Sequence, residues 1–289
     1  MPAPSATPPD RPPLLTRAVH EQLREAARAG AREVTCSLDL GRTTTTVAVD
    51  EGGWTAGGRC YPWPGDCRDR TVYYWDGAAF EPVARFGTGL VKLVPTEWGP
   101  PTFEIDGIKM LPTAKVSPWD DAGAKVALVR PRGRVVLDTC GGLGYFAAWC
   151  LASGAARVLS FEKNPDVLWL RRLNPWSPEG GNGDTAGLEL RHADITREIG
   201  TLGTASVDAI LHDPPRFGIA GELYAGAFYA ELARVLRPGG RLFHYTGTPN
   251  RLTTGRDVPA EVAKRLRAAG FAAEPKGDGV LAMNATGRR

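Results

Sequence analysis

The sequence predicts an α/β protein in which a parallel sheet follows a small β-rich domain. Two observations predict this fold. Residues 117–289 alternate short apolar runs with stretches of helical length, which is typical of βαβ units. Residues 32–115 contain shorter runs in which apolar and polar residues alternate, separated by Gly and Pro. That second pattern indicates short strands joined by turns.

Composition limits the function before any motif is considered. The 289 residues carry 35 Lys and Arg against 32 Asp and Glu, a net charge of +3. Such a balance excludes a protein that mainly wraps nucleic acid electrostatically. A hydrophobic content of 43% is sufficient for a buried core. No apolar run approaches the ~18 residues of a membrane span, and no secretory signal is visible, so we expect no membrane partner.

The five cysteines are odd in number, and no two of them form a C-x-x-C pair. We therefore expect neither a disulfide framework nor a zinc site, and no other metal ligand set stands out. A reducing, cytoplasmic location fits this usage.

The N-terminal part divides into two regions. Residues 1–13 are rich in Pro and are expected to form a disordered lead. Residues 14–116 are expected to form a helix followed by the small β-rich domain. Helix formers cover residues 14–30, with Gly30 as the C-cap. An apolar stripe is expected along this helix, made of Leu14, Ala18, Leu23 and Ala26. The dipeptide Asp76-Gly77 between two short runs predicts a β-hairpin.

The third region, residues 117–289, is expected to form one domain of alternating strands and helices. The apolar runs predict strands over 134–138, 157–163, 188–194, 206–212, 241–247 and 279–283. The stretches between and before them predict helices over 117–128, 145–154, 165–173, 225–240 and 258–271.

An acidic residue stands at or just after the end of each of the first four predicted strands. These residues are Asp138, Glu162, Asp194 and Asp213. Parallel sheets bind ligands at the carboxyl ends of their strands, so we expect the four carboxylates to gather there. An acid in the position of Glu162 can accept both hydroxyls of a ribose, and Asp194 can accept from an adenine amino group. Taken singly, each acid could equally cap a helix.

The loop after the first of these strands reads Thr139-Cys140-Gly141-Gly142-Leu143-Gly144. Its glycines allow a sharp turn and a close approach of the backbone to a ligand. It contains neither the G-K-[ST] of a P-loop nor a G-x-G-x-x-G spacing. The loop therefore indicates a ligand without identifying it.

The strings VLDTCGGLG, FEKN, HAD, DAILHDPPRF and LRPGGRLFHYTG resemble the ordered motifs of class I S-adenosylmethionine-dependent methyltransferases. The resemblance covers residues 117–289. Within that superfamily the sequence is similar to the predicted archaeal-type, spermidine-synthase-like group, whose N-terminal extension also resembles KLVP and EIDGIKM. The resemblance implies a Rossmann-like sheet of seven strands with the last antiparallel. It also implies an S-adenosyl-L-methionine cofactor.

The resemblance assigns roles along the chain. The cofactor-binding residues would be Asp138, Thr139, Cys140, Gly142, Gly144, Glu162 and Asp194. Cys140 departs from the family, which has Gly there, so the amino-acid end of the cofactor is expected to sit differently.

Catalysis is expected to depend on Asp213, as the acceptor of a substrate proton or hydrogen bond, and on Arg216. Arg216 stands where related enzymes often have an aromatic residue, and it would suit a substrate carboxylate or phosphate. His212, Phe217, Tyr224 and Tyr229 are expected to bind the substrate. His212 could equally be a buried neutral histidine that donates to a carbonyl, and the tyrosines could equally belong to the core packing.

Three functions follow. The first is an S-adenosylmethionine-dependent methyltransferase acting on a small molecule, supported by the near-neutral charge and Arg216. The second transfers or cyclises the aminocarboxypropyl or aminopropyl arm of the cofactor and releases methylthioadenosine. Its support is the string ELYAGAFY, which is similar to spermidine synthases.

The third is an RNA methyltransferase that binds nucleic acid through its N-terminal domain. Its candidate contacts are Arg130, Arg132, Arg134, Tyr73, Tyr74 and Trp75. A small-molecule substrate is the favoured partner, and a homodimer is left open.

Overall fold

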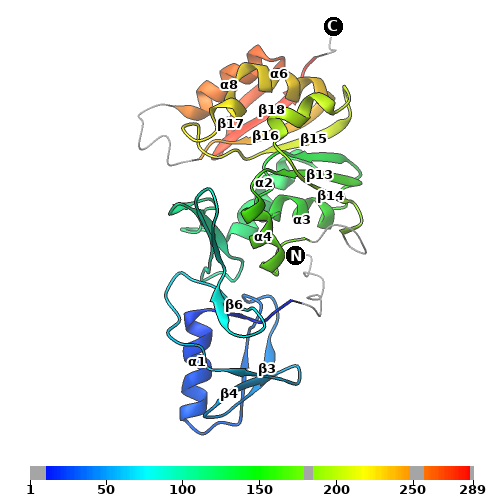
Figure 1. Cartoon of the computed structure of the whole chain (residues 1–289). Coiled ribbons are helices and arrows are strands. Elements are labelled where there is room, and N and C mark those ends of the chain that lie inside the picture. Colours follow the sequence, from blue (N-terminus) through cyan, green and yellow to red (C-terminus); the bar gives the residue numbers. More distant parts are fainter. Residues whose placement is uncertain (1–10, 179–184, 248–256, 287–289) are drawn as a thin grey trace. The chain divides into compact units, whose positions relative to one another are not determined.

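The structure is a computed structural model that describes residues 11–178, 185–247 and 257–286. These residues form two compact units (Figure 1). The first unit contains the chain up to Asp121 together with Trp169–Ser177, and the second contains Ala122–Leu168 and the chain from Pro178 onward. The division falls inside helix α2 (Pro118–Val129), beyond the expected boundary at 116. Residues 1–10 of the expected disordered lead lie outside the described residues.

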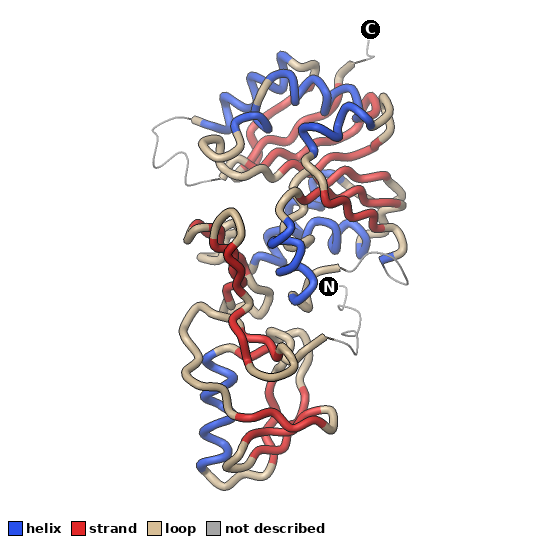
Figure 2. The backbone as a smooth tube through the Cα atoms, in the orientation of Figure 1, coloured by secondary structure: helices blue, strands red, loops and turns tan. Residues whose placement is uncertain are grey.

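The first unit consists of helix α1 (Arg17–Arg28) and three antiparallel sheets, drawn in red in Figure 2. One sheet has the order β1 (Leu14–Leu15), β6 (Tyr73–Trp75), β7 (Phe80–Pro82). The next has the order β2 (Glu33–Cys36), β3 (Thr45–Val49), β4 (Gly53–Ala56), β5 (Arg59–Pro62). The last has the order β11 (Ile108–Lys109), β10 (Thr102–Ile105), β9 (Leu90–Val94), β8 (Ala84–Phe86).

Helix α1 begins three residues later than the sequence predicts, because Leu14 and Leu15 pair with β6 as a strand. Thr16 caps the helix by accepting a hydrogen bond from the backbone N–H of Val19. Leu23 is fully buried, whereas Ala18 is exposed and does not belong to the apolar stripe. The stripe that faces the core is therefore narrower than predicted.

The predicted hairpin at Asp76-Gly77 is confirmed: β6 and β7 pair antiparallel around it. Oδ1 of Asp76 accepts hydrogen bonds from the backbone N–H groups of Ala78 and Ala79. Gly77 has a φ of 117°, a conformation that favours glycine. The conformation of this turn is therefore determined by residues 76–79 themselves.

The segment Trp169–Ser177 is held within the first unit by specific contacts. The Trp169 ring meets the Tyr74 ring edge-on at 5.8 Å, and the Arg85 guanidinium lies 4.1 Å from its centroid. Arg11 donates to the carbonyl of Asn174 at 2.7 Å. Arg42 donates to the carbonyl of Pro175. Residues far apart in the sequence therefore build one core.

The second unit is a seven-stranded sheet with helices on both faces, in agreement with the fold that the resemblance implies. The strand order is β14 (Leu188–His192), β13 (Arg157–Glu162), β12 (Val135–Asp138), β15 (Val207–His212), β16 (Leu236–Tyr245), β18 (Gly279–Asn284), β17 (Phe271–Lys276). The last strand in the sequence, β18, lies between β16 and β17 and pairs antiparallel with both. Figure 1 shows α6 (Gly226–Val235) and α8 (Val258–Ala268) over one face. Helices α2 and α3 (Tyr145–Ala152) cover the other. Helix α4 (Pro165–Leu173) follows β13 as predicted.

Two boundaries in this unit differ from the sequence prediction. Helix α6 ends at Val235 rather than Gly240, because the chain enters β16 at Leu236, just before Pro238. Proline disfavours a helical conformation in the residue before it, so the helix stops early. Strand β17 was not predicted, because its sequence FAAEPK has neither a run of apolar residues nor a regular alternation. Its Pro275 is tolerated because β17 is an edge strand.

Candidate active site at the carboxyl edge of the sheet

The strand register aligns the predicted acidic residues along one edge of the second unit's sheet. Asp138 pairs with Ser160 and Leu211, and Glu162 pairs with His192. Asp213 directly follows His212, the last residue of β15. Asp138, Glu162 and Asp213 all lie close enough to Cys140 for their charges to raise the pKa of its thiol. The edge therefore collects three carboxylates around the loop that follows β12.

Asp138 is fully buried at the end of β12. The hydroxyl of Ser160 on β13 donates to its Oδ2 at 2.8 Å. A buried carboxylate needs such donors, because its desolvation is otherwise costly. Ser160 was not predicted as a site residue. Its only sequence signal is a polar residue inside an otherwise apolar strand.

The loop after β12 is held in place by its neighbours. The backbone N–H of Gly141 donates to the carbonyl of Phe161 at 2.7 Å, and that of Gly142 donates to Oε2 of Glu162 at 3.0 Å. Gly142 and Gly144 have φ values of 49° and 81°, which a residue with a side chain rarely adopts. Oε1 of Glu162 accepts from the N–H of Asn164 at 2.8 Å. The hydrogen bond from Gly142 to Glu162 therefore holds the glycine loop after β12 in place.

Cys140 is half-buried in this loop. Burial raises the pKa of its thiol well above the ordinary value, and the three carboxylates add to the rise. The thiolate is the reactive form of cysteine. Cys140 is therefore a neutral thiol at physiological pH, in keeping with a small loop residue rather than a nucleophile.

Asp194 follows β14, the strand next to β13 in the sheet, and caps helix α5 (Ile195–Glu198). Its Oδ1 accepts from the N–H and the hydroxyl of Thr196 at 2.9 Å and 2.7 Å. Burial raises the pKa of Asp194, but these hydrogen bonds and the charge of Lys163 outweigh it, so the net direction is downward. Lys163 lies 3.9 Å from Asp194 and 3.7 Å from Glu222. The helix-capping role that the sequence left open for Asp194 is therefore confirmed. Lys163 was not predicted as a site residue.

His212 is fully buried, and both of its ring nitrogens have partners. Nδ1 lies 2.7 Å from the hydroxyl of Thr139, and Nε2 lies 3.1 Å from the carbonyl of Leu223. Burial lowers the pKa of His212 to about 4, so the ring is neutral at pH 7. This matches a buried histidine that donates to a carbonyl. Direct substrate contact by His212 stays a prediction with less support.

The remaining predicted substrate-binding residues divide into buried and exposed ones. Tyr229 is fully buried, and its hydroxyl lies 2.9 Å from Nε2 of His244. Tyr224 is buried and donates to the carbonyl of Pro215 at 3.1 Å. Burial raises the pKa of Tyr224, and the charge of Asp213 raises it further. The tyrosines are therefore neutral, and only Tyr224 is close to Asp213.

Arg216 and Phe217 lie on the exposed turn that follows Pro215. The Phe217 ring is 52% exposed and meets the Tyr224 ring edge-on at 5.5 Å. The guanidinium of Arg265 lies 5.8 Å from the centroid of the Phe217 ring. These residues form an accessible rim beside Asp213.

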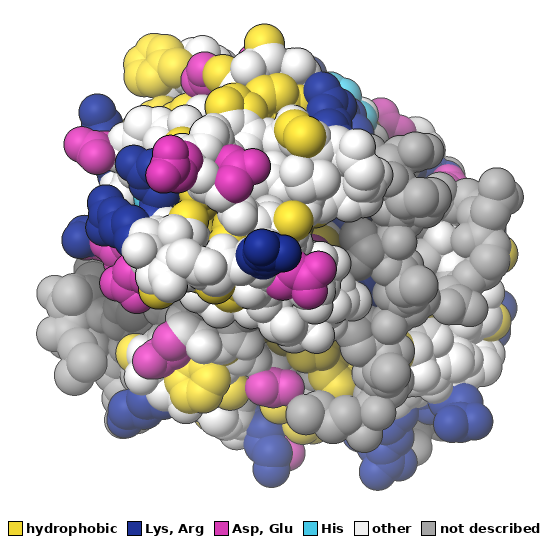
Figure 3. All heavy atoms as spheres, turned by 90° about the horizontal axis from the view of Figure 1, so that it is seen from below, with side chains coloured by type: hydrophobic (Ala, Val, Ile, Leu, Met, Phe, Trp, Pro, Cys, Tyr) yellow, Lys and Arg dark blue, Asp and Glu magenta, His cyan; other side chains and the backbone are white. Residues whose placement is uncertain are grey.

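The residues proposed for RNA contact belong to both units, the three aromatic residues to the first and the three arginines to the second. Tyr73 is buried, Tyr74 packs against Trp169, and Trp75 meets the Tyr61 ring at 5.4 Å. Arg130, Arg132 and Arg134 precede β12, so they lie toward the amino ends of the strands, away from Asp138. Figure 3 shows acidic and basic side chains interspersed on one face of the molecule. Tyr73, Tyr74 and Trp75 therefore do not form an exposed surface on which nucleic-acid bases could stack.

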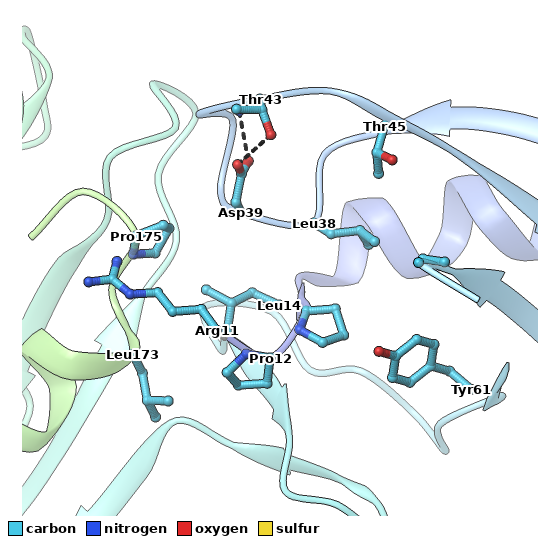
Figure 4. Close-up of a pocket in the computed structure, with 13 residues that line it drawn as sticks. Arg11, Pro12, Leu14, Leu38, Asp39, Thr43, Thr45, Tyr61, Leu173 and Pro175 are labelled. Atoms are coloured by element: carbon cyan, nitrogen blue, oxygen red, sulfur yellow. Dashed lines mark hydrogen bonds between the residues drawn. The ribbon is translucent and has the colours of Figure 1, made fainter. Parts of the chain in front are cut away.

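A cavity of about 240 Å³ lies in the first unit (Figure 4). None of the predicted site residues lines it. The carboxylate of Asp39 at its wall accepts hydrogen bonds from Thr43 at 2.9 Å and 2.6 Å. The Arg11 guanidinium donates to main-chain carbonyls. These polar groups serve the chain's own turns, so the cavity is not the candidate site.

Within the described ranges, no cluster of His, Cys, Asp or Glu has the composition of a metal site. The helices in those same ranges are all too short or too polar to cross a bilayer. The predicted cytoplasmic location and the homodimer stay predictions.

Solved structures share this architecture. A spermidine synthase in complex with the transition-state analogue AdoDATO superposes with a TM-score of 0.54 and 15% identity, over 71% of this chain and 73% of that chain. The spermidine synthase of Thermotoga maritima gives 0.53 and 15%, over 78% and 81%. MNMC2 from Aquifex aeolicus gives 0.51 and 18%, over 70% and 72%. These likenesses establish the Rossmann-like α/β fold that spermidine synthases also have.

A relative closer in sequence is an uncharacterised protein of Methanocaldococcus jannaschii. It is 45% identical over 197 residues, which are 68% of this chain and 66% of the relative. The chain therefore matches just under two thirds of that relative's length. No model of a known protein family matches the sequence.

Proposed function

We propose that the chain is an S-adenosylmethionine-dependent transferase that methylates a small molecule. The observation that carries this proposal is the convergence of Asp138, Glu162 and Asp213 on the glycine loop after β12. The fold shared with spermidine synthases supports a nucleoside-sulfonium ligand at this edge.

The residues present fit this cofactor. The charges of three carboxylates converge on Cys140, so the edge carries a negative potential that favours a ligand with a sulfonium and an ammonium group. The two Glu162 oxygens accept backbone N–H groups of Gly142 and Asn164, and a carboxylate oxygen can accept more than one hydrogen bond, so Glu162 could also accept from a ribose hydroxyl. The residues that would hold the cofactor are Asp138, Thr139, Cys140, Gly142, Gly144, Glu162 and Asp194. When bound, S-adenosylmethionine supplies a carbon attached to a positively charged sulfur, from which an acceptor can displace the thioether.

The chain's own residues then position and shield the acceptor. Asp213 would take a hydrogen bond or a proton from the nucleophilic atom. Tyr224 is buried, and it lies close enough to Asp213 for that charge to raise the pKa of its hydroxyl; it would help to exclude water from that side of the carboxylate. Arg216 stands exposed on the rim, where its guanidinium could bind a substrate carboxylate or phosphate in bidentate fashion.

A second candidate function is the transfer or cyclisation of the cofactor's three-carbon arm. Two observations favour it: the string ELYAGAFY, and a fold similar to two spermidine synthases. Asp213 would serve the same purpose, because the acceptor is again a nucleophile at a carbon attached to sulfur. The two functions differ in the by-product, which is S-adenosylhomocysteine or methylthioadenosine.

RNA methylation has weaker support. Tyr73, Tyr74 and Trp75 are engaged in packing, and the three arginines lie away from the site edge. If RNA were nevertheless the acceptor, binding would weaken steeply with salt.

Mass spectrometry of the by-product tests the proposal. Purified protein would be incubated with S-adenosylmethionine, with and without a small-molecule cell extract. We expect S-adenosylhomocysteine with extract, reduced about a hundredfold in Asp213→Asn. The exposed Glu261 on α8 provides the control Glu261→Gln, which also removes one carboxylate and should leave the yield unchanged. Methylthioadenosine would overturn the methyl assignment, and failure to bind S-adenosylmethionine would overturn the whole proposal.

A further inference from the structure

His212 bridges two segments of the candidate site. A carbonyl can only accept a hydrogen bond, so the contact with Leu223 places the ring proton on Nε2. Nδ1 is then the acceptor, and the hydroxyl of Thr139 donates to it at 2.7 Å. The carbonyl of Leu211 lies farther from that hydroxyl, at 3.4 Å. The neutral ring therefore uses one donor and one acceptor, each toward a different segment.

The segments joined in this way are two separate parts of the chain. Thr139 is the first residue of the loop that follows Asp138 and carries Cys140. Leu223 lies in the short helix η3 (Gly221–Tyr224) and directly precedes Tyr224. His212 itself directly precedes Asp213. One imidazole thus links the glycine loop, the candidate base Asp213 and the segment that carries Tyr224.

Packing alone does not account for a histidine here. The His212 ring lies 5.4 Å from the Phe228 ring and 4.4 Å from the His244 ring. An apolar aromatic ring would fill the same space without the cost of burying two polar nitrogens. What the imidazole adds to such a ring is its pair of hydrogen bonds, one at each nitrogen.

We propose that His212 is a positioning residue, which holds Asp213 and Tyr224 at a fixed place relative to the glycine loop through Thr139 and Leu223. The proposal rests on the function proposed above, because the loop is taken to bind the cofactor. It predicts that breaking the bridge at either end loosens both segments and weakens cofactor binding.

The matched variants are Thr139→Val, which removes the hydroxyl at nearly constant shape, and Thr139→Ser, which keeps it. His212→Phe removes both nitrogens. If that variant folds poorly, it is replaced by His212→Gln, which retains one donor and one acceptor. Asn284→Ala is the control. Asn284 is also buried and bridges two carbonyls, those of Ala233 and Leu236, but it contacts neither site segment.

The first measurement is amide hydrogen exchange of the ligand-free protein. We expect Thr139→Val and His212→Phe to lose protection both at Gly141 and Gly142 and at Leu223, while Thr139→Ser retains it. Asn284→Ala should lose protection only around α6 and β18. Loosening confined to the mutated segment in both variants, or equal loosening in Asn284→Ala, would overturn the proposal.

The second measurement is the affinity for S-adenosylhomocysteine by calorimetry. We expect about a tenfold loss in Thr139→Val and in His212→Phe, the order expected for one hydrogen bond, with little further loss in the double variant. Thr139→Ser should restore most of the affinity. Unchanged affinity in both single variants, or additive losses, would overturn the positioning role. If the unmodified protein binds no S-adenosylhomocysteine, the proposed function fails, and the exchange result still decides whether the bridge exists.

Discussion

Acid should destabilise this protein through His212. Burial lowers the pKa of His212 from 6.5 to about 4. Between these two pH values the His212 ring is protonated in the unfolded chain and neutral in the folded chain. The free energy of unfolding therefore falls as the pH falls. Each pKa unit is worth about 1.4 kcal/mol. The loss should reach about 2 kcal/mol at pH 5 and about 3 kcal/mol near pH 4.

The assay is urea unfolding at pH 7 and pH 5, followed by fluorescence. Burial also lowers the pKa of His244 and, more weakly, of His20, so the comparison must isolate His212. His212→Phe lacks the titrating ring, and it should lose about 2 kcal/mol less than the unmodified protein between the two pH values. Equal losses in the two proteins would refute the reasoning, whatever their absolute stabilities. His212→Gln is the substitute if the phenylalanine variant does not fold.

Three further outcomes are expected. Ser160→Ala should lower the free energy of unfolding by about 1–3 kcal/mol, because Asp138 loses a donor while it stays buried; an unchanged urea midpoint would contradict this. Glu162→Gln should weaken S-adenosylmethionine binding in calorimetry by about tenfold or more, whereas Glu189→Gln, on the edge strand β14, should leave it unchanged. Leu23→Ala should cost about 2–5 kcal/mol of unfolding free energy, since the side chain is fully buried; a cost below about 1 kcal/mol would show that the helix packs loosely.

Much of the fold follows from local sequence signals. The alternation of strands and helices in residues 117–289 predicts the parallel part of the sheet, and Asp76-Gly77 predicts its hairpin. Strand β17 could not be predicted in this way, because its place depends on pairing with β18. The late start of α1 likewise depends on β6, which lies far along the chain.

The candidate site shows the same division. The acidic residues could be predicted, because each stands at a strand end where parallel sheets bind ligands. Ser160, Lys163 and the contact between Thr139 and His212 could not. Their partners become neighbours only when separate strands align. A sequence pattern thus locates the charges of a site, whereas the groups that orient those charges depend on tertiary contacts.

The segment Trp169–Ser177 has a consequence for any attempt to dissect the chain. A shortened protein that begins at Ala122 would retain Trp169, which is only 8% exposed in the whole chain, but would lose the Tyr74 ring and the Arg85 guanidinium that cover it. It would also lose Arg11 and Arg42, the donors to the carbonyls of Asn174 and Pro175. Such a fragment would expose the Trp169 indole to solvent, and it should aggregate or fray at the end of α4. The seven-stranded unit of this protein is therefore not a detachable module.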